Sequence, residues 1–224
     1  MAADGFDAAA QVAVVTGGGS GIGQALCGAL AQSGIRSVVA ADRNLEAARR
    51  VAAAINETYS HSPALALELD VVESRSVEAL VEKVETEIGP IDLWCSNAGL
   101  HAGDGLGETT DWRRSLDVNL MGDVNAARAV IPRMVERRNG HFVVTASAAG
   151  LLTGFRCAPY AASKHAAVAL AEWLSITYAD DGVSVSCVRP EGVRTRMTKP
   201  DSSRLECRAT FSREDVTREI FEAV

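Results

Sequence analysis

A tyrosine and a lysine stand four residues apart in the stretch YAASK, at Tyr160 and Lys164, inside an apolar segment typical of a helix. Residues at i and i+4 lie on one face of a helix. A free tyrosine has a pKa of about 10, and lowering it to about 7 takes roughly 4 kcal/mol of interaction that favours the phenolate. A nearby ammonium supplies such an interaction, and Ser147, thirteen residues before Tyr160, can hold a substrate oxygen at the tyrosine hydroxyl. The alternative is that Lys164 is only a surface charge.

A glycine-rich stretch, TGGGSGIG (16–23), joins a short apolar run to a helical pattern. Glycines in such a turn allow a tight bend, a close approach of the backbone to a phosphate and close packing of the helix on the strand. The free N–H groups of the helix N-terminus then face a pyrophosphate. The stretch therefore predicts a dinucleotide site rather than a merely flexible turn, with contacts from Gly17, Ser20, Gly21, Ile22 and Gly23.

An acidic residue, Asp42, ends the second apolar run, and Arg43 follows it. A carboxylate at this position binds both hydroxyls of an adenine ribose and repels a 2′-phosphate, which favours NAD over NADP. Arg43 works in the opposite direction, because a guanidinium attracts that phosphate. Asp42 is also a candidate N-cap for the helix expected at 44–57, and this role is compatible with ribose binding.

Two further strand ends carry polar or small residues. Asp70 and Val71 follow the third apolar run, and SNAG (96–99) ends the fourth. We expect Asp70 to reach the adenine amino group, and Asn97, Ala98 and Gly99 to lie near the adenosine ribose. Each stretch on its own is equally typical of an ordinary turn.

The composition excludes several classes of protein. The 224 residues include 22 basic and 29 acidic ones, for a formal net charge of −7, which argues against nucleic-acid binding. Neither a secretory signal nor an apolar run of about 20 residues is present, so we expect no membrane span. The five scattered cysteines, an odd number, indicate free thiols in the cytoplasm. His101 and His141 have no spaced partners, so no metal site is predicted.

Short apolar runs alternate with helical patterns along the chain. Strands are expected at 11–15, 37–41, 64–69, 92–96, 141–146 and 183–188, and helices near 21–33, 44–57, 74–88, 109–138 and 159–180. This alternation predicts an α/β fold with an open parallel sheet. The longest irregular stretches, 97–108 and 189–211, follow the fourth and sixth strands. Ligands bind beyond the carboxyl ends of such strands, so these stretches are expected to wall the pocket.

Taken in order, TGGGSGIG, SNAG, LDVNLMG with Asn119, Ser147, YAASK and RPEGVRT resemble the motifs of the short-chain dehydrogenase/reductase family over about residues 11–198. The resemblance implies a Rossmann-like doubly wound sheet of order 3-2-1-4-5-6 in one domain, 1–224, with 1–10 flexible and 196–224 forming a substrate loop and terminal helix. It also implies a catalytic tetrad and two contacts to the nicotinamide carboxamide: Asn119, Ser147, Tyr160 and Lys164, with Val193 and Thr195.

In the family's pattern Tyr160 is the acid/base. Lys164 lowers its pKa and binds the nicotinamide ribose, and Asn119 kinks its helix so that a water links Lys164 to solvent. The resemblance implies an NAD-dependent oxidoreductase that interconverts a secondary alcohol and a ketone. The alternatives are an NADP-dependent carbonyl reductase and a non-catalytic dinucleotide sensor, which would tend to lose the tyrosine or lysine. A homodimer or homotetramer is expected.

Two departures from the family pattern stand out. Glu191 replaces the glycine that usually follows the proline in the sixth-strand loop. The seventh strand that normally closes the sheet is apparently absent, and we expect that the sequence is a truncated view of a longer protein.

Overall fold

The structure is a computed structural model that describes residues 11–61, 63–153, 156–191, 193, 197 and 212. Its six strands, all parallel, form one sheet in the order β3-β2-β1-β4-β5-β6. The strands are β1 (Val12–Thr16), β2 (Ser37–Asp42), β3 (Ala64–Glu68), β4 (Leu93–Ser96), β5 (Gly140–Thr145) and β6 (Val183–Val188). The predicted α/β class and strand order are confirmed.

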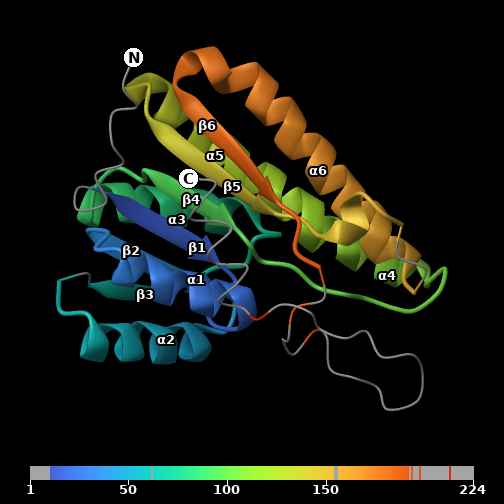
Figure 1. Cartoon of the computed structure of the whole chain (residues 1–224), viewed down its shortest axis with the longest axis horizontal. Coiled ribbons are helices and arrows are strands. Elements are labelled where there is room, and N and C mark those ends of the chain that lie inside the picture. The colour runs from blue at the N-terminus through green and yellow to red at the C-terminus, as the bar shows by residue number, and fades with distance from the viewer. Residues whose placement is uncertain are drawn as a thin grey trace.

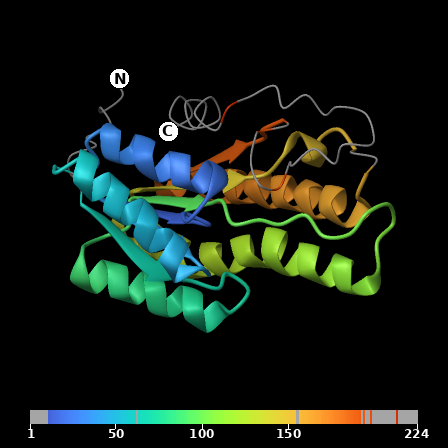
Figure 2. The same cartoon turned by 90° about the horizontal axis from the view of Figure 1, so that it is seen from below.

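Helices cover both faces of the sheet (Figures 1 and 2). They are α1 (Gly21–Gln32), α2 (Leu45–Thr58), α3 (Ser74–Glu87), α4 (Thr109–Leu116), α5 (Gly122–Arg137) and α6 (Ala158–Tyr178). Alternate residues of β1 show why the strands are continuously apolar. Val12 and Val14 pack with α3, α5 and α6, whereas Ala13 and Val15 pack with α1 and α2. A strand covered on both faces needs no polar side.

The helix predicted at 109–138 is interrupted in the structure. A π-helix, η2 (Asp117–Met121), separates α4 from α5, and Asn119 lies in its middle. Single π-turns inside α-helices are frequent at functional sites. Two short 3₁₀ segments, η3 (Ala148–Gly150) and η4 (Ala179–Asp181), follow β5 and α6. Gly182 ends η4 in the left-handed conformation, at φ 79°, as a helix stop requires.

The turns that follow the carboxyl ends of the strands carry the residues singled out in the sequence. Of the two stretches expected to wall a pocket, 97–108 is an irregular loop between β4 and α4, whereas 189–211 lies mostly outside the described residues, as does the predicted terminal helix. None of the helices in the described part of the chain is long and apolar enough to cross a membrane.

Candidate active site

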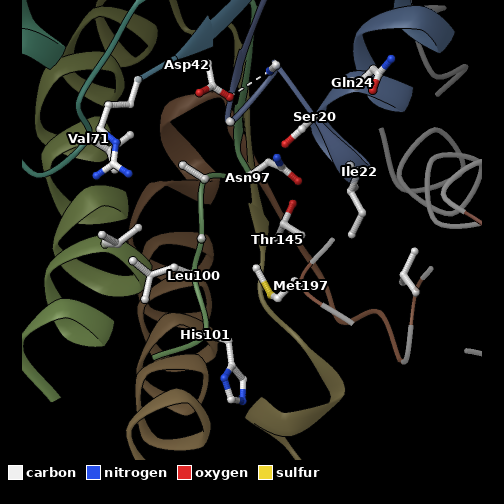
Figure 3. Close-up of a pocket in the computed structure, with 18 of the residues that line it drawn as sticks. Ser20, Ile22, Gln24, Asp42, Val71, Asn97, Leu100, His101, Thr145 and Met197 are labelled. Carbon is white, nitrogen blue, oxygen red and sulfur yellow. Dashed lines mark hydrogen bonds between the residues drawn. The ribbon is translucent and has the colours of Figure 1, made fainter. Parts of the chain in front are cut away.

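A cavity of about 990 Å³ opens at the carboxyl ends of the strands. This volume is at the upper end of the range for ligand pockets. Figure 3 shows Asp42 near one end, His101 at the other, and Asn97 and Leu100 between them. Most of the predicted site residues line the cavity: Gly17, Ser20, Gly21, Ile22, Asp42, Arg43, Asp70, Val71, Asn97, Ala98, Gly99, Ser147, Tyr160, Lys164 and Val193.

Three predicted residues do not line the cavity. Gly23 and Asn119 support it from beneath, and Thr195 lies outside the described residues. A Cβ at Gly23 would lie 2.3 Å from the carbonyl oxygen of Gly17, a distance that no real side chain tolerates. Gly23 therefore allows α1 to approach the turn that precedes it.

The glycine turn suits a diphosphate. Gly17 and Gly21 have φ angles of 65° and 58°, a region that favours glycine. At the N-terminus of α1, Ser20 makes no capping hydrogen bond with its side chain, and the first turn contains no acidic residue. The free N–H groups and the positive end of the helix dipole therefore remain available for an anion.

The carboxylate of Asp42 is held at the rim of the cavity by two backbone groups. Gly19 N donates to Oδ2 at 3.0 Å, and Asn44 N donates to Oδ1 at 2.8 Å. A Cβ at Gly19 would lie 2.9 Å from Oδ2, so only glycine permits this contact without a shift. The proposed N-cap role of Asp42 is wrong, because the side chain of Asn44 caps α2 by accepting from Ala47 N.

Cationic side chains also lie beside this carboxylate. Arg43 and Arg50 both line the cavity, and both are exposed. Arg50 was not predicted, since an arginine in the middle of an amphipathic helix resembles any solvated charge. The rim therefore carries one carboxylate and two guanidinium groups.

Thr16 joins the glycine turn to the SNAG stretch. Its Oγ1 accepts from Asn97 N and Ala98 N, both at 2.9 Å, and its carbonyl oxygen accepts from Asn97 Nδ2 at 2.9 Å. Asn97 and Ala98 thus serve both as a structural turn and as cavity wall. Thr16 is one of the residues that the sequence did not single out.

The turn after β3 is also fixed from below. Asp70 Oδ1 accepts from Val72 N at 3.1 Å, and the side chain of Asn125 on α5 donates to the carbonyl oxygens of Val71 and Val72. Asp70 therefore forms a turn of its own and still faces the cavity. The turn that the sequence left open as an alternative is therefore confirmed, and the contact of Asp70 with the adenine amino group stays a prediction.

Ser147 and Tyr160, two of the predicted catalytic residues, are joined by a hydrogen bond at one end of the cavity, which is called the catalytic end below. A hydrogen bond from the Ser147 side chain lowers the pKa of Tyr160, but burial has the larger effect and raises that pKa above its ordinary value. Cys157 raises it further. The predicted lowering of the tyrosine pKa is therefore not met by the protein's own groups, because desolvation of the phenolate outweighs the serine hydrogen bond.

Lys164 is buried, with 4% of its surface exposed. Its Nζ donates to the carbonyl oxygen of Thr145 at 2.7 Å. Burial lowers the pKa of Lys164, and the charge of Asp123 raises it. Lys164 is thus not a charge on the helix surface, and this alternative is wrong.

Asn119 links three segments around the catalytic end. Its Oδ1 accepts from Leu100 N at 2.8 Å, and its Nδ2 donates to Leu100 O and to Ser163 Oγ at 2.9 and 3.0 Å. Ser163 in turn donates to the carbonyl oxygen of Tyr160 at 2.8 Å. The π-helix around Asn119 interrupts the helix at the expected place, while the kink and the water link to Lys164 remain predictions. Ser163, in the middle of YAASK, was missed.

The loop after β4 forms the outer wall of the catalytic end. The ring of His101 lies against that of Tyr160, with 5.1 Å between the ring centroids. Gly105 N donates to Arg156 O, and Ala158 N donates to Gly105 O at 2.8 Å, which ties this loop to the start of α6. Cys157 is buried under the loop and donates to Ala102 O, so it does not line the cavity mouth.

Glu191 also lines the cavity, beside Pro190. Within the described residues no group of three or more histidine, cysteine, aspartate or glutamate side chains could hold a metal ion.

The sequence matches known proteins over most of its length. The family model described as short chain dehydrogenase matches residues 11–206. Meso-2,3-butanediol dehydrogenase of Serratia marcescens is 34% identical over 190 residues, which cover 84% of this chain and 73% of that protein. Cyclohexanol dehydrogenase of an Acinetobacter species is 34% identical over 194 residues, covering 83% and 74%.

A solved structure agrees with these relatives. The short chain dehydrogenase/reductase from Burkholderia phymatum in complex with NAD superimposes with a TM-score of 0.81 and 32% identity, covering 98% of this chain and 81% of that one. Fold, motif order and these matches lead to one conclusion: the chain belongs to the short-chain dehydrogenase/reductase family of oxidoreductases.

Proposed function

We propose that the protein interconverts a secondary alcohol and a ketone with NAD as cofactor, and that Tyr160 is the acid/base. The observation that carries this proposal is that a hydrogen bond joins Ser147 to Tyr160, whose ring lies against His101 at one end of the cavity, whereas Asp42 lies near the other end. A dinucleotide laid along this cavity would bring its nicotinamide to the two hydroxyls.

The bound cofactor supplies a hydride acceptor in one direction and a hydride donor in the other. The residues of the chain handle the proton and the geometry. Ser147 holds the substrate oxygen at Tyr160, whose phenolic oxygen takes the proton from an alcohol or returns it to a ketone. The hydrogen bond from Ser147 favours the phenolate. We propose that the positive charge of Lys164, four residues further along α6, favours it as well.

The raised pKa of Tyr160 indicates a role for the positive charge of the oxidised cofactor, which would favour the phenolate. Burial disfavours the phenolate in the protein alone. A positive nicotinamide ring beside the tyrosine favours the charged form. We therefore expect the tyrosine to become acidic only when the oxidised cofactor is bound, and Lys164 and Asn119 to hold the ribose side of the site in place.

The choice of NAD over NADP depends on Asp42. Its fixed carboxylate accepts hydrogen bonds from a ribose that carries two hydroxyls, and it repels a 2′-phosphate. Arg43 and Arg50 at the same rim favour the alternative, an NADP-dependent carbonyl reductase. The solved relative in complex with NAD supports the first choice. A dinucleotide sensor is disfavoured, because Asn119, Ser147, Tyr160 and Lys164 are all present.

The substrate is proposed to be a small alcohol or ketone, as the names of the two dehydrogenase relatives suggest. A panel that contains butane-2,3-diol, cyclohexanol and butan-2-ol, assayed with NAD⁺ and NADP⁺ by the absorbance of the reduced cofactor, tests the proposal. A tertiary alcohol is the matched control, because it has the hydroxyl but no hydrogen on the reacting carbon. Turnover of no secondary alcohol with either cofactor, or equal signal from the tertiary alcohol, would overturn it.

We also propose that the protein forms at least a homodimer. The outer face of α6 exposes a stripe of small and apolar side chains at Ala162, Ala169, Trp173 and Ile176, and Ile176 is 82% exposed. These positions follow the seven-residue spacing of a helix that packs along another helix. Light scattering at micromolar concentration should give at least twice the monomer mass, and Ile176→Glu should lower it. A monomeric wild type contradicts the proposal.

We also propose that the protein is cytoplasmic and, as a separate point, that it forms a single domain. Cys27, Cys95, Cys157 and Cys187 are free thiols in the described part of the chain. Burial raises the pKa of Cys27 to about 12, so this thiol stays protonated and unreactive. A thiol count on the denatured protein without reductant should find every cysteine free. One sheet carries both ends of the cavity, which supports the single domain.

A further inference from the structure

Two charged side chains are buried in the part of the chain that the structure describes, and they have opposite charges. Asp123 of α5 and Lys164 of α6 each have 4% of their surface exposed. A buried charge is costly unless another charge or hydrogen bonds compensate for it. The proposed function uses Lys164 but gives Asp123 no task.

The two side chains, from α5 and α6, reach neighbouring strands at the same end of the sheet. Ser96 Oγ, at the end of β4, donates to Asp123 Oδ1 at 2.5 Å. Lys164 Nζ donates to the carbonyl oxygen of Thr145, at the end of β5. The register pairs Ser96 with Val144, so the hydrogen-bond partners of the two charges lie side by side. Lys164 lines the cavity, Asp123 does not, and the two charges interact through space.

The electrostatic effects of the two groups are mutual. Burial lowers the pKa of Lys164 and the charge of Asp123 raises it. Burial raises the pKa of Asp123 to about 7, while Lys164 and the Ser96 hydrogen bond lower it. The carboxylate is thus ionised at alkaline pH, where Lys164 would otherwise lose its proton. At acid pH the carboxylate is protonated, and the lysine keeps its charge without it.

Other groups around the pair are few. Cys187 of β6 is half-buried, interacts with both charges, and has a pKa raised by burial, so it stays a neutral thiol. Arg189 and Glu172 act on Cys187. Ser96 of β4 and Thr145 of β5 do not titrate. Tyr160 of α6 is the other titratable group that the proposed function places near Lys164, and burial raises its pKa, so it disfavours the phenolate. Among the described residues, Asp123 is therefore the buried carboxylate that acts on Lys164.

We propose that Asp123 is a positioning residue that acts as the buried counter-charge of Lys164 and keeps the lysine protonated at the pH of alcohol oxidation. This role rests on the proposed function, because the lysine must be cationic to favour the phenolate of Tyr160. Asp123 touches neither substrate nor cofactor and acts only through Lys164.

The first test measures the lysine directly and needs no activity. The sequence contains only three lysines, Lys83, Lys164 and Lys199, so lysine labelled with ¹³C at the ε-carbon gives three resolvable NMR signals. The signal of Lys164 is assigned by its loss in Lys164→Met. Asp123→Asn should lower the titration midpoint of Lys164 by about one pH unit or more, as expected for the loss of an opposite charge nearby. Exposed Lys83, which pairs with Glu87, should not move.

The second test connects the charge to catalysis. In the wild type, alcohol oxidation should fall at high pH when Lys164 loses its proton, and this alkaline limb should lie at lower pH in Asp123→Asn. Ser96→Ala is the matched control, because it removes the buried hydrogen bond but keeps the carboxylate, and its alkaline limb should stay near that of the wild type. Asp123→Ser is a second variant if asparagine prevents folding.

The outcomes separate this inference from the proposed function. An unchanged midpoint of Lys164 in both Asp123 variants would show that the carboxylate only fills space, and would overturn the inference. A lowered midpoint supports it even if no alcohol is oxidised. A protein that oxidises alcohols while Asp123→Asn loses only thermal stability, with its pH profile unmoved, would contradict the inference and leave the proposed function standing.

Discussion

The two halves of the sheet build the cavity in different ways. In the half formed by β1, β2 and β3, the glycine turn adds backbone to the cavity wall at Gly17, Gly19 and Gly21, and the carboxylate of Asp42 is fixed by two backbone N–H groups. In the half formed by β4, β5 and β6, the polar groups described above belong to side chains. Lys164 and Asn119 are buried there and hydrogen-bonded to segments distant in sequence.

This difference predicts two kinds of sensitivity to mutation. In the β1–β3 half an added side chain should collide with backbone and weaken cofactor binding. In the β4–β6 half a removed hydroxyl or charge should change proton transfer, and with it kcat and the pH profile. Each of the following predictions tests one side of this contrast.

The largest effect is expected at Tyr160. Tyr160→Phe keeps the ring and removes the hydroxyl, so kcat for alcohol oxidation should fall by at least about 10²-fold, while cofactor affinity stays nearly unchanged. Lys164→Met should lose activity and also bind the cofactor more weakly, because the proposed function has the lysine act on both the tyrosine and the ribose. Steady-state kinetics and cofactor titrations measure the two effects. A Tyr160→Phe protein with most of its turnover would refute the mechanism.

The pH dependence should show that the cofactor completes the site. The base form of Tyr160 is the phenolate, so oxidation should rise with pH, by about tenfold per unit below its pKa. In the protein without cofactor, burial is the main cause that holds this pKa above its ordinary value. We expect the tyrosinate absorbance of the NAD⁺ complex to titrate at lower pH than that of the protein alone. Identical titrations would show that the cofactor charge does not reach the tyrosine.

A pair of glycines in α1 tests the backbone-built half. Gly23→Ala would place Cβ 2.3 Å from Gly17 O, and the shift this forces should cost about 1–3 kcal/mol, or about fivefold to 150-fold in cofactor Kd if it falls on the bound state. Gly28 lies in the same helix with nothing near its Cβ position. Gly28→Ala should leave Kd unchanged and stabilise the protein by up to about 1 kcal/mol. Equal effects of both substitutions would be evidence against the packing argument.

A smaller effect is expected at the rim. Asp42→Asn keeps the shape of the side chain and removes its charge, so the affinity ratio of NADP(H) to NAD(H) should rise by about tenfold or more. Arg43→Ala should lower that ratio. Tryptophan fluorescence titrations with both cofactors measure it. If wild-type NADPH already binds more tightly than NADH, the arginines dominate and the assignment of NAD is wrong.

The smallest effect is expected at His101. Its ring lies 5.1 Å from that of Tyr160, and such aromatic pairs contribute about 0.5–1.5 kcal/mol. His101→Ala should therefore raise the KM of the substrate by roughly two- to tenfold with cofactor Kd unchanged. His101→Phe retains the ring and should lie closer to the wild type. A change in cofactor Kd would place His101 outside the substrate end of the cavity.

The sequence predicted the fold and most of the cavity wall because those signals are local. A glycine turn between a strand and a helix, or a tyrosine four residues before a lysine, is visible within a few residues. The partners of these groups were not visible. Thr16, Ser163 and Asp123 each sit in an apolar run and contact segments tens of residues away. The same limit explains the tyrosine: a helix pattern shows that Lys164 is near, but not how strongly burial opposes the phenolate.

The π-helix at Asp117–Met121 has a consequence for the phase of the helices that flank it. One residue advances an α-helix by about 100°, so the extra residue of a π-turn rotates everything after it by that angle. Asn119 must point toward Leu100 and Ser163, while Ala126, Val130 and Met134 of α5 must face the sheet. In an unbroken α-helix, one continuous helical repeat would have to direct both Asn119 and the apolar residues of α5. The π-turn shifts the helical repeat between α4 and α5, so the two parts of the segment can present different faces. Deletion of one residue there would turn the apolar stripe of α5 away from the core.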